Sequence, residues 1–173
     1  MGTPSKDFIE SQFNDYYKEY FSRIYRYTYR LTGNNEEAEQ LTQQTFASLY
    51  GYFLSKSKTI NARPLLFRIA TNACFNYLSK KKKNEEVLNK MSASDSSQDN
   101  PLQETINSQR KELIQKGLAQ LKRRDRLCIL LYLEGLSYSE ISHIIKVNKI
   151  TVGKVLLRAI ERLALQIKKG DRL

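Results

Sequence analysis

Residues 134–163 read EGLSYSEISHIIKVNKITVGKVLLRAIERL, and this stretch decides the fold of the second half of the chain. Ser137 and Glu140 have the spacing of a capping box, which predicts the start of a short helix. Asn148 is a favourable N-cap, and beyond it apolar residues recur three and four positions apart over a longer helix. Two helices joined by a turn at residues 146–148, the second one basic, are typical of a helix-turn-helix.

Two more helices are predicted before this pair, over about residues 104–121 and about residues 124–134. Gly135 stops the second of them, because glycine readily adopts the left-handed conformation that ends a helix. The carboxy-terminal part is therefore expected to be a four-helix domain that ends in the helix-turn-helix. The inward positions of the first of these helices are predicted to be Leu113, Ile114, Gly117, Leu118 and Leu121.

The outer face of the last predicted helix carries several cations. The second helix of such a pair lies in the major groove, where Thr151 and Lys154 would meet base edges. Residues 108–173 carry a net charge of +9, which favours DNA as the partner, although many helix pairs with a basic exterior only pack. The candidate DNA contacts are Lys149, Thr151, Lys154, Leu157, Arg158 and Arg162.

Residues 1–83 predict three further helices. The first, over about residues 7–31, has Tyr and Phe three or four positions apart, which favours a core face over a base-stacking platform. The second starts near Asn34, a capping residue that Glu37 is placed to reciprocate. The third starts at Pro64, which suits a first helical position, and runs to the four lysines at residues 80–83.

Two surfaces of these helices are candidates for contacts. One side of the second helix carries acids and amides, and such a side is either a solvated face or a docking surface for a basic partner. The outer side of the third helix combines amides and cations, which either face solvent or contact base edges and phosphates. The polar and basic loop at residues 55–62 could hold an extruded base. The outer positions of the third helix are Arg68, Asn72, Asn76, Ser79, Lys80 and Lys83.

Composition and charge define the domain organisation. The 173-residue chain has a formal net charge of +11, and its few Gly (7) and Pro (3) residues favour helices over a sheet. Residues 84–107 carry a net charge of −4 and include a serine-rich polar stretch, which predicts a flexible acidic linker. We therefore expect an all-α protein in which this linker joins two small helical domains, residues 1–83 and residues 108–173.

Several functional classes are excluded at this stage. No run approaches the roughly 18 apolar residues that a membrane span needs, and the amino terminus lacks the apolar core of a signal peptide. Cys74 and Cys128 are isolated and His143 is the single histidine, so neither a disulfide framework nor a metal site is expected. We expect a cytosolic protein without cofactor, small-molecule substrate or membrane insertion.

The chain resembles the bacterial sigma-70-type factors of the extracytoplasmic-function (ECF) group. Residues 37–46 (EAEQLTQQTF), 66–72 (LFRIATN) and 76–78 (NYL) are similar to their second conserved region. Residues 118–121 (LAQL), 136–141 (LSYSEI), 151–152 (TV), 156–159 (LLRA) and 162–163 (RL) are similar to their fourth region. The resemblance covers nearly the whole chain, in the order of the family and with the linker in the same place.

This resemblance implies a factor that binds core RNA polymerase and directs it to a class of promoters. In the family, one face of the second helix docks on the clamp helices of the largest polymerase subunit. The flap region of the polymerase is a further implied contact. The docking residues here would be Glu39, Gln40, Leu41, Gln43 and Gln44.

The resemblance also implies two promoter contacts. The third helix and the loop before it would hold the −10 element, and the last helix would read the −35 element with the residues named above. The linker would enter the polymerase channel, and an anti-sigma protein is a further implied partner. The factor would be cytoplasmic, and nucleoid-associated when bound to polymerase. The −10 contacts would be Asn61, Arg68, Asn72, Asn76 and Lys80.

Five positions depart from the family pattern. Gln40 stands where Asp is usual, which removes one charge from the docking face, and Ser79 stands where Arg is common. Gly153 and Val155 stand where basic or polar residues often occur, so the −35 sequence of the family does not carry over. Lys146 stands where the turn usually has Gly, which adds strain if its φ is positive.

Two other classes of function remain open from the residues alone. A stand-alone helix-turn-helix regulator would bind duplex DNA without polymerase and would need no separate first domain. An enzyme acting on nucleic acid would need a carboxylate cluster or a nucleophile with its base, and the acids here lie on helix faces and at caps. We therefore expect no enzyme activity. The sequence leaves open whether the two basic domains fold against each other.

Overall fold

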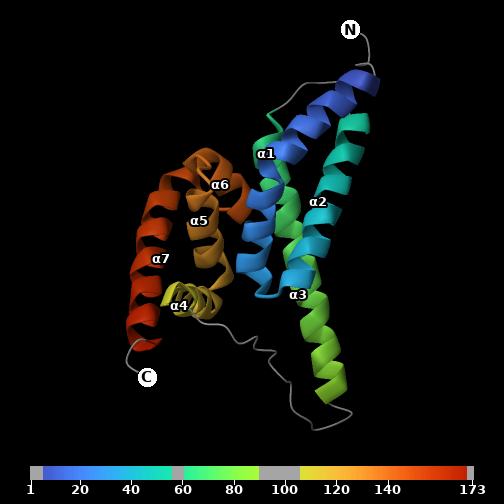
Figure 1. Ribbon diagram of the computed structural model, residues 1–173. Helices are drawn as coiled ribbons and strands as arrows, with labels where there is room; N and C mark the ends of the chain where they lie inside the picture. The colour runs from blue at the N-terminus through green and yellow to red at the C-terminus, as the bar shows by residue number, and fades with distance from the viewer. Residues whose placement is uncertain (1–5, 56–60, 90–105, 171–173) are drawn as a thin grey trace.

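The computed structural model describes residues 6–55, 61–89 and 106–170, and every regular element in these ranges is an α-helix. Figure 1 shows two groups of helices side by side. The all-α expectation is therefore confirmed. The amino-terminal module consists of α1 (Lys6–Thr32), α2 (Asn35–Ser55) and α3 (Ala62–Asn89). The carboxy-terminal module consists of α4 (Ile106–Gln120), α5 (Arg123–Leu133), α6 (Tyr138–Ile145) and α7 (Lys149–Gly170).

The turn between α1 and α2 follows the predicted chemistry in part. Gly33 has a φ of +77°, and its amide donates to the Tyr29 carbonyl at 2.8 Å, which ends α1. Asn34 caps α2, because its side-chain oxygen accepts the Glu37 amide at 3.0 Å. The expectation that Glu37 returns a bond to the cap is wrong, since its carboxylate is bonded to side chains of α3 instead.

The start of α3 also differs from the prediction. The helix begins at Ala62 rather than at Pro64, because Asn61 Oδ1 accepts the Arg63 amide at 3.2 Å and caps the helix. Pro64 lies in the first turn, where backbone N–H groups have no partner within the helix, so its lack of an N–H removes no hydrogen bond.

Helices reach into both ends of the predicted linker. Residues 84–89 extend α3, because their sequence NEEVLN has no glycine or proline to stop the helix, and residues 106–107 begin α4. The expectation of a flexible linker over residues 84–107 is thus wrong at both ends. The part between, residues 90–105, lies outside the described residues and includes the serine-rich stretch.

The aromatic face of α1 packs into the core of the amino-terminal module. Ile24 and Tyr27 have no exposed surface, and the Tyr27 hydroxyl lies 2.7 Å from Thr71 Oγ1 of α3. Phe46 of α2 packs against three aromatic rings of α1, with the ring centres of Tyr17 and Phe46 4.9 Å apart. The core interpretation of this face is therefore confirmed.

α6 and α7 form the helix-turn-helix. The Ser137 hydroxyl accepts the Glu140 amide, and the Glu140 carboxylate accepts the Ser137 amide at 2.7 Å, so the predicted capping box is confirmed. Lys146 ends α6 with a φ of +56°, a left-handed conformation that costs a side chain some strain. Asn148 caps α7, because its side-chain oxygen accepts the Ile150 amide at 3.0 Å.

α4 and α7 approach closely at Gly117. A Cβ atom at this position would lie 3.1 Å from Leu163 Cδ1 of α7, so a larger residue would require the Leu163 side chain to shift. Leu118 and Leu121 are buried as predicted. Ile114 is 42% exposed, so its predicted inward position is wrong.

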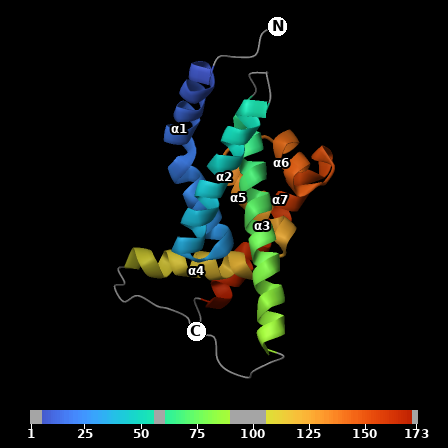
Figure 2. The same ribbon diagram turned by 90° about the vertical axis from the view of Figure 1, so that its right-hand side faces the viewer.

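The two modules pack against each other, which the sequence left open. Their buried apolar residues form one continuous core, and Figure 2 shows α4 lying crosswise to the long helices of the amino-terminal module. Gln115 of α4 donates to the Tyr29 and Arg30 carbonyls at 3.2 and 3.3 Å, which satisfies the last turn of α1. The Arg123 guanidinium carbon of α5 lies 3.6 Å from the centre of the Phe75 ring of α3. The chain therefore adopts a closed arrangement.

Candidate nucleic-acid interface

The outer side of α3 is exposed along its length. The polar stripe has the helical spacing that places its members on one side of the helix. Asn61 is also exposed, although its side-chain oxygen is already engaged in capping α3. The stripe therefore offers amide and cationic groups from a single helix face. Its exposed members are Arg68, Asn72, Asn76, Ser79, Lys80 and Lys83. Most of the loop that was predicted to hold a base, residues 56–60, lies outside the described residues.

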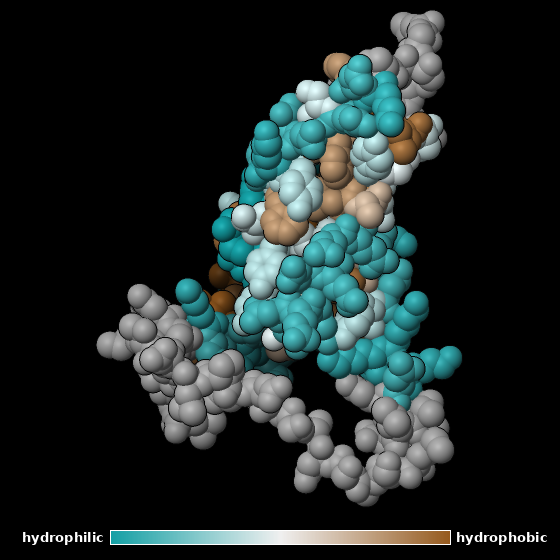
Figure 3. Space-filling view, turned by 45° about the vertical axis from the view of Figure 1, so that its right-hand side comes forward, coloured by the Kyte–Doolittle hydropathy of each residue, from teal (hydrophilic) through white to brown (hydrophobic). Residues whose placement is uncertain are grey.

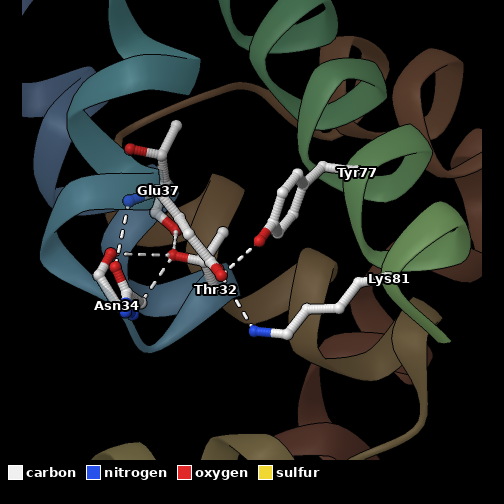
Figure 4. Close-up of polar contacts among 6 residues, drawn as sticks. Thr32, Asn34, Glu37, Tyr77 and Lys81 are labelled. Atoms are coloured by element: carbon white, nitrogen blue, oxygen red, sulfur yellow. Dashed lines mark hydrogen bonds and ion pairs between the residues drawn. The ribbon is translucent and has the colours of Figure 1, made fainter. Parts of the chain in front are cut away.

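Glu37 connects the start of α2 to the middle of α3. Its Oε1 atom lies 2.8 Å from Lys81 Nζ, and the Tyr77 hydroxyl donates to the same oxygen. Figure 4 shows both side chains reaching from α3 toward Glu37, beside Asn34 and Thr32. The Glu37 side chain is 13% exposed and that of Lys81 is 46% exposed, so water still screens this ion pair from the lysine side. The contact fixes the polar side of α2 relative to the outer stripe of α3.

The polar side of α2 is exposed except at one predicted position. Figure 3 shows that the surface on the side of α2 and α3 is mostly hydrophilic, with a smaller apolar area in its upper part. Leu41, which the resemblance placed among the docking residues, is 5% exposed. It shares the buried stripe of α2 with Ala38 and Thr45, so its assignment to the exposed docking face is corrected. The exposed members are Glu39, Gln40, Gln43 and Gln44.

All six predicted −35 contacts on α7 are exposed, and they differ in their surroundings. The Thr151 hydroxyl donates to the Asn148 carbonyl at 2.7 Å, which holds it at the start of the helix. Leu157 is 60% exposed and is the apolar member of the set. Gly153 lies close to the ring of Tyr138, because a Cβ atom at this position would be 3.4 Å from Cε2. Lys149, Lys154 and Arg158 complete the face, together with Arg162.

Arg162 forms an ion pair with a buried carboxylate that the sequence did not predict. Asp125 of α5 is 1% exposed, and its carboxylate accepts bonds from the Arg162 and Arg124 guanidinium groups. A cavity of about 160 Å³ beside this pair is lined by four cations and one carboxylate. The lining residues are Arg124, Asp125, Thr151, Lys154, Val155, Arg158 and Arg162. The excess of positive charge around this cavity favours an anion.

Sequence reasoning missed Arg124 and Asp125. A signal was present, because Asp125 is the single acid in the run KRRDR at residues 122–126. Asp125 is buried in the structure, and it is paired with Arg124 and Arg162, as a buried acid generally must be.

The structure also limits two other kinds of site. Across residues 6–55, 61–89 and 106–170, no helix combines the length and the apolar character that crossing a membrane would require. In the same ranges, His, Cys, Asp and Glu side chains do not gather in groups of three or more that could hold a metal ion.

Comparison with known proteins identifies both modules. Residues 16–84 match the family model described as Sigma-70 region 2, and residues 111–163 match that described as Sigma-70, region 4. The ECF RNA polymerase sigma factor SigM of Bacillus subtilis is 28% identical over 91% of this chain and 96% of its own length. This chain is a sigma-70-type RNA polymerase sigma factor of the ECF group.

Other proteins are similar to this chain in sequence or in fold. The RNA polymerase sigma factor YlaC of Bacillus subtilis is 27% identical over 90% of this sigma factor and 90% of its own length. The sigma factor RpoE of Bartonella quintana, solved with the anti-sigma factor NepR, is similar in fold, with a TM-score of 0.68. The two sequences are 23% identical, and the match covers 91% of this chain and 97% of RpoE. CnrH, solved with the cytosolic domain of CnrY, gives a TM-score of 0.69 at 14% identity, over 92% and 90% of the two chains.

Proposed function

We propose that this sigma factor docks on core RNA polymerase through the exposed side of α2 and contacts the promoter through α3 and α7. Residues 1–83 would form the region 2-like domain, and residues 108–173 the region 4-like domain. One observation carries the assignment: the two family regions occur in order, on separate helical modules whose polar contact faces are exposed. A stand-alone regulator would need no region 2-like module, so that alternative is not favoured.

The two promoter contacts would use different chemistry. The stripe on α3 combines amides and cations, which suits contacts to bases and phosphates of the −10 element. On α7, Thr151, Lys154 and Arg158 would face the major groove of the −35 element, while Arg162 would act at the backbone. The region between the modules would follow the polymerase channel, where an acidic chain occupies a basic nucleic-acid path.

The factor would work in the cytoplasm, where promoter DNA and polymerase are found, and would associate with the nucleoid when bound to polymerase. Sigma factors act in transcription initiation without catalysing a reaction, and we propose the same for this chain. The clamp helices of the largest subunit and the flap region are the proposed polymerase contacts. Because RpoE was solved with the anti-sigma factor NepR, we also propose an anti-sigma protein as a partner here.

A pull-down with bacterial core polymerase, followed by transcription from a pool of promoters, tests this function. The wild-type chain is expected to co-elute with core polymerase and to produce start sites that depend on the chain. The double variant Gln43→Ala/Gln44→Ala should weaken co-elution without changing the melting temperature, because both side chains are exposed on α2. Leu41 is unsuitable for this test, since its truncation would disturb the core.

Gln120→Ala on α4 is the matched control, because it removes an exposed amide from the other module. Equal co-elution of the double variant and the control would remove α2 as the docking face. If the wild-type chain binds no polymerase and instead binds specific duplex DNA by itself, the stand-alone regulator becomes the better function.

A further inference from the structure

Glu134 follows α5 and lies buried against the amino-terminal module. Its side chain is 7% exposed, although glutamate is rarely buried unless it is paired. The carboxylate meets two guanidinium groups of α1. Arg23 Nε lies 3.1 Å from Oε2, and Arg30 Nη1 lies 3.5 Å from Oε1. The ion pairs therefore join the two modules.

Arginine side chains also bind the backbone around Glu134. Arg23 Nη2 donates to the Glu134 carbonyl at 2.7 Å, and Arg63 Nη2, from the first turn of α3, donates to it at 3.2 Å. Arg63 also donates to the Gly135 carbonyl. Carbonyl groups at the end of a helix carry partial negative charge, so they add to the charge of the carboxylate. We call Arg23, Arg30 and Arg63 the arginine site.

The arginine site belongs wholly to the amino-terminal module. The Arg23 guanidinium carbon lies over the ring of Tyr20, 5.2 Å from its centre, and Tyr20 is 7% exposed. Of the described residues, only Glu134 forms an ion pair with these arginines. Arg63 Nε is buried and has no hydrogen-bond partner within the described part of the chain. Guanidinium groups that converge in this way bind the oxygens of a phosphate well.

The closed arrangement is too small to occupy both promoter elements at once, and this step rests on the proposed function. By their names, the −10 and −35 elements are centred about 25 base pairs apart, or about 85 Å at 3.4 Å per base pair. The longest helix, α3, has 28 residues and is about 42 Å long at 1.5 Å per residue. A compact chain of this length has a radius of gyration of only about 16 Å. The modules must therefore separate when both elements are bound, and Glu134 must leave the arginine site.

We propose that the arginine site is a second DNA contact of the amino-terminal module. In the closed state Glu134 occupies this site. In the open state a backbone phosphate next to the −10 element occupies it. One observation connects the site to the −10 side, and a second connects it to a phosphate. Arg63 is two residues from Asn61, whose side chain accepts the Arg63 amide, so the site begins where the predicted −10 contacts begin. The Glu134 carboxylate and the two carbonyls also present oxygens to the arginines as a phosphate does.

This arrangement couples opening to DNA binding. Since Glu134 and the phosphate would use the same three guanidinium groups, each excludes the other. Closing the protein therefore lowers its affinity for DNA, and DNA lowers the closed fraction by the same factor. Removing the Glu134 charge should relieve this competition, whereas removing an arginine should open the protein and also remove a DNA contact. The two kinds of variant therefore separate a DNA site from a purely structural contact.

The test measures DNA affinity and size for the full chain, using Glu134→Gln and Arg30→Gln. Arg30 is chosen because its ion pair involves only the carboxylate, so the backbone contacts of the other arginines remain. The probe is a fluorescein-labelled forked duplex of mixed sequence, titrated at several salt concentrations, with the radius of gyration measured by small-angle X-ray scattering. Glu134→Gln should enlarge the radius and bind the probe about tenfold more tightly, within the usual range of about 5- to 150-fold for coupled sites.

Arg30→Gln should enlarge the radius in the same way but bind no more tightly than wild type, with a salt slope smaller by about one unit. Arg26→Gln, which removes an exposed arginine of α1 outside the site, is the matched control and should leave the radius unchanged. If Arg30→Gln gains as much affinity as Glu134→Gln, the arginines hold the modules together without binding DNA, and the proposal is wrong. An unchanged affinity of Glu134→Gln also overturns it. Transcription by the wild-type chain tests the proposed function separately.

Discussion

Replacing Arg162 by alanine tests whether this residue stabilises the carboxy-terminal module, in addition to any role at DNA. Its guanidinium group is bonded to the Asp125 carboxylate, which joins α7 to the start of α5. Asp125 is 1% exposed, whereas Arg162 is 48% exposed. The substitution therefore leaves a buried carboxylate whose remaining ion pair, with Arg124, has a longer separation of 3.4 Å.

The size of the effect follows from this asymmetry. Breaking a fully buried ion pair by removing one partner costs about 3–5 kcal/mol. Arg162 is half exposed and Arg124 still neutralises the carboxylate, so we expect about 2 kcal/mol, close to one charge-assisted hydrogen bond. For a chain of this size, that corresponds to a fall in melting temperature of about 4–8 °C.

Thermal unfolding followed by circular dichroism is the assay, and Arg158→Ala is its matched control. Arg158 lines the same cavity and is exposed, and within the described residues no ion pair of it is found. Its melting temperature should stay within about 1–2 °C of wild type, as for most surface substitutions. Adding Asp125→Asn to Arg162→Ala removes the buried charge that Arg124 alone would then balance, and should recover part of the loss. Equal melting temperatures for Arg162→Ala and Arg158→Ala would refute the structural role of the ion pair.

Two further predictions concern stability. Burial raises the pKa of the Cys74 thiol to about 12 and that of Cys128 to about 11, from about 9, so the folded state keeps protons that the unfolded chain loses. The free energy of unfolding should therefore fall above pH 9 by about 1.4 kcal/mol per pH unit for each thiol. Urea titrations at several pH values should show a shallower fall for Cys74→Ala than for the wild-type chain. An equal fall in the two proteins would contradict this prediction. Lys146→Gly should stabilise the turn by about 1 kcal/mol, because glycine adopts the positive φ of this position without strain. A lower melting temperature of Lys146→Gly would contradict that explanation.

The helix ends that the sequence predicted correctly depend on groups within a few residues of one another. Ser137 and Glu140 form the capping box in the structure, and Gly135 has the expected positive φ. Glu37 shows the limit of this reasoning. Its spacing from Asn34 fits a capping box, but Tyr77 and Lys81 compete for its carboxylate from 40 and 44 positions away, and no local pattern reveals that.

The sequence predicts those parts of the candidate site whose residues all lie on one face of a single helix. The outer stripe of α3 and the polar side of α2 follow from helical periodicity, and their members are exposed. Leu41 was misplaced because the motif that carries the resemblance runs around the helix and includes a core position. The contacts of Asp125 and Glu134 were missed, because Arg162 is 37 and Arg23 is 111 positions away from its partner.

These missed contacts have a common electrostatic reason. In a chain of net charge +11, cations gather on each module and repel one another. A buried carboxylate between them lowers that repulsion and also fixes where the guanidinium groups point, and Asp125 does this within the carboxy-terminal module. Glu134 does the same between the modules, where its partners belong to the other unit. A charge inside one module contributes to its folding at all times, but a charge between modules contributes only while they remain in contact. Loss of Asp125 should therefore reduce the stability of the fold, whereas loss of the Glu134 charge should mainly change how often the modules separate.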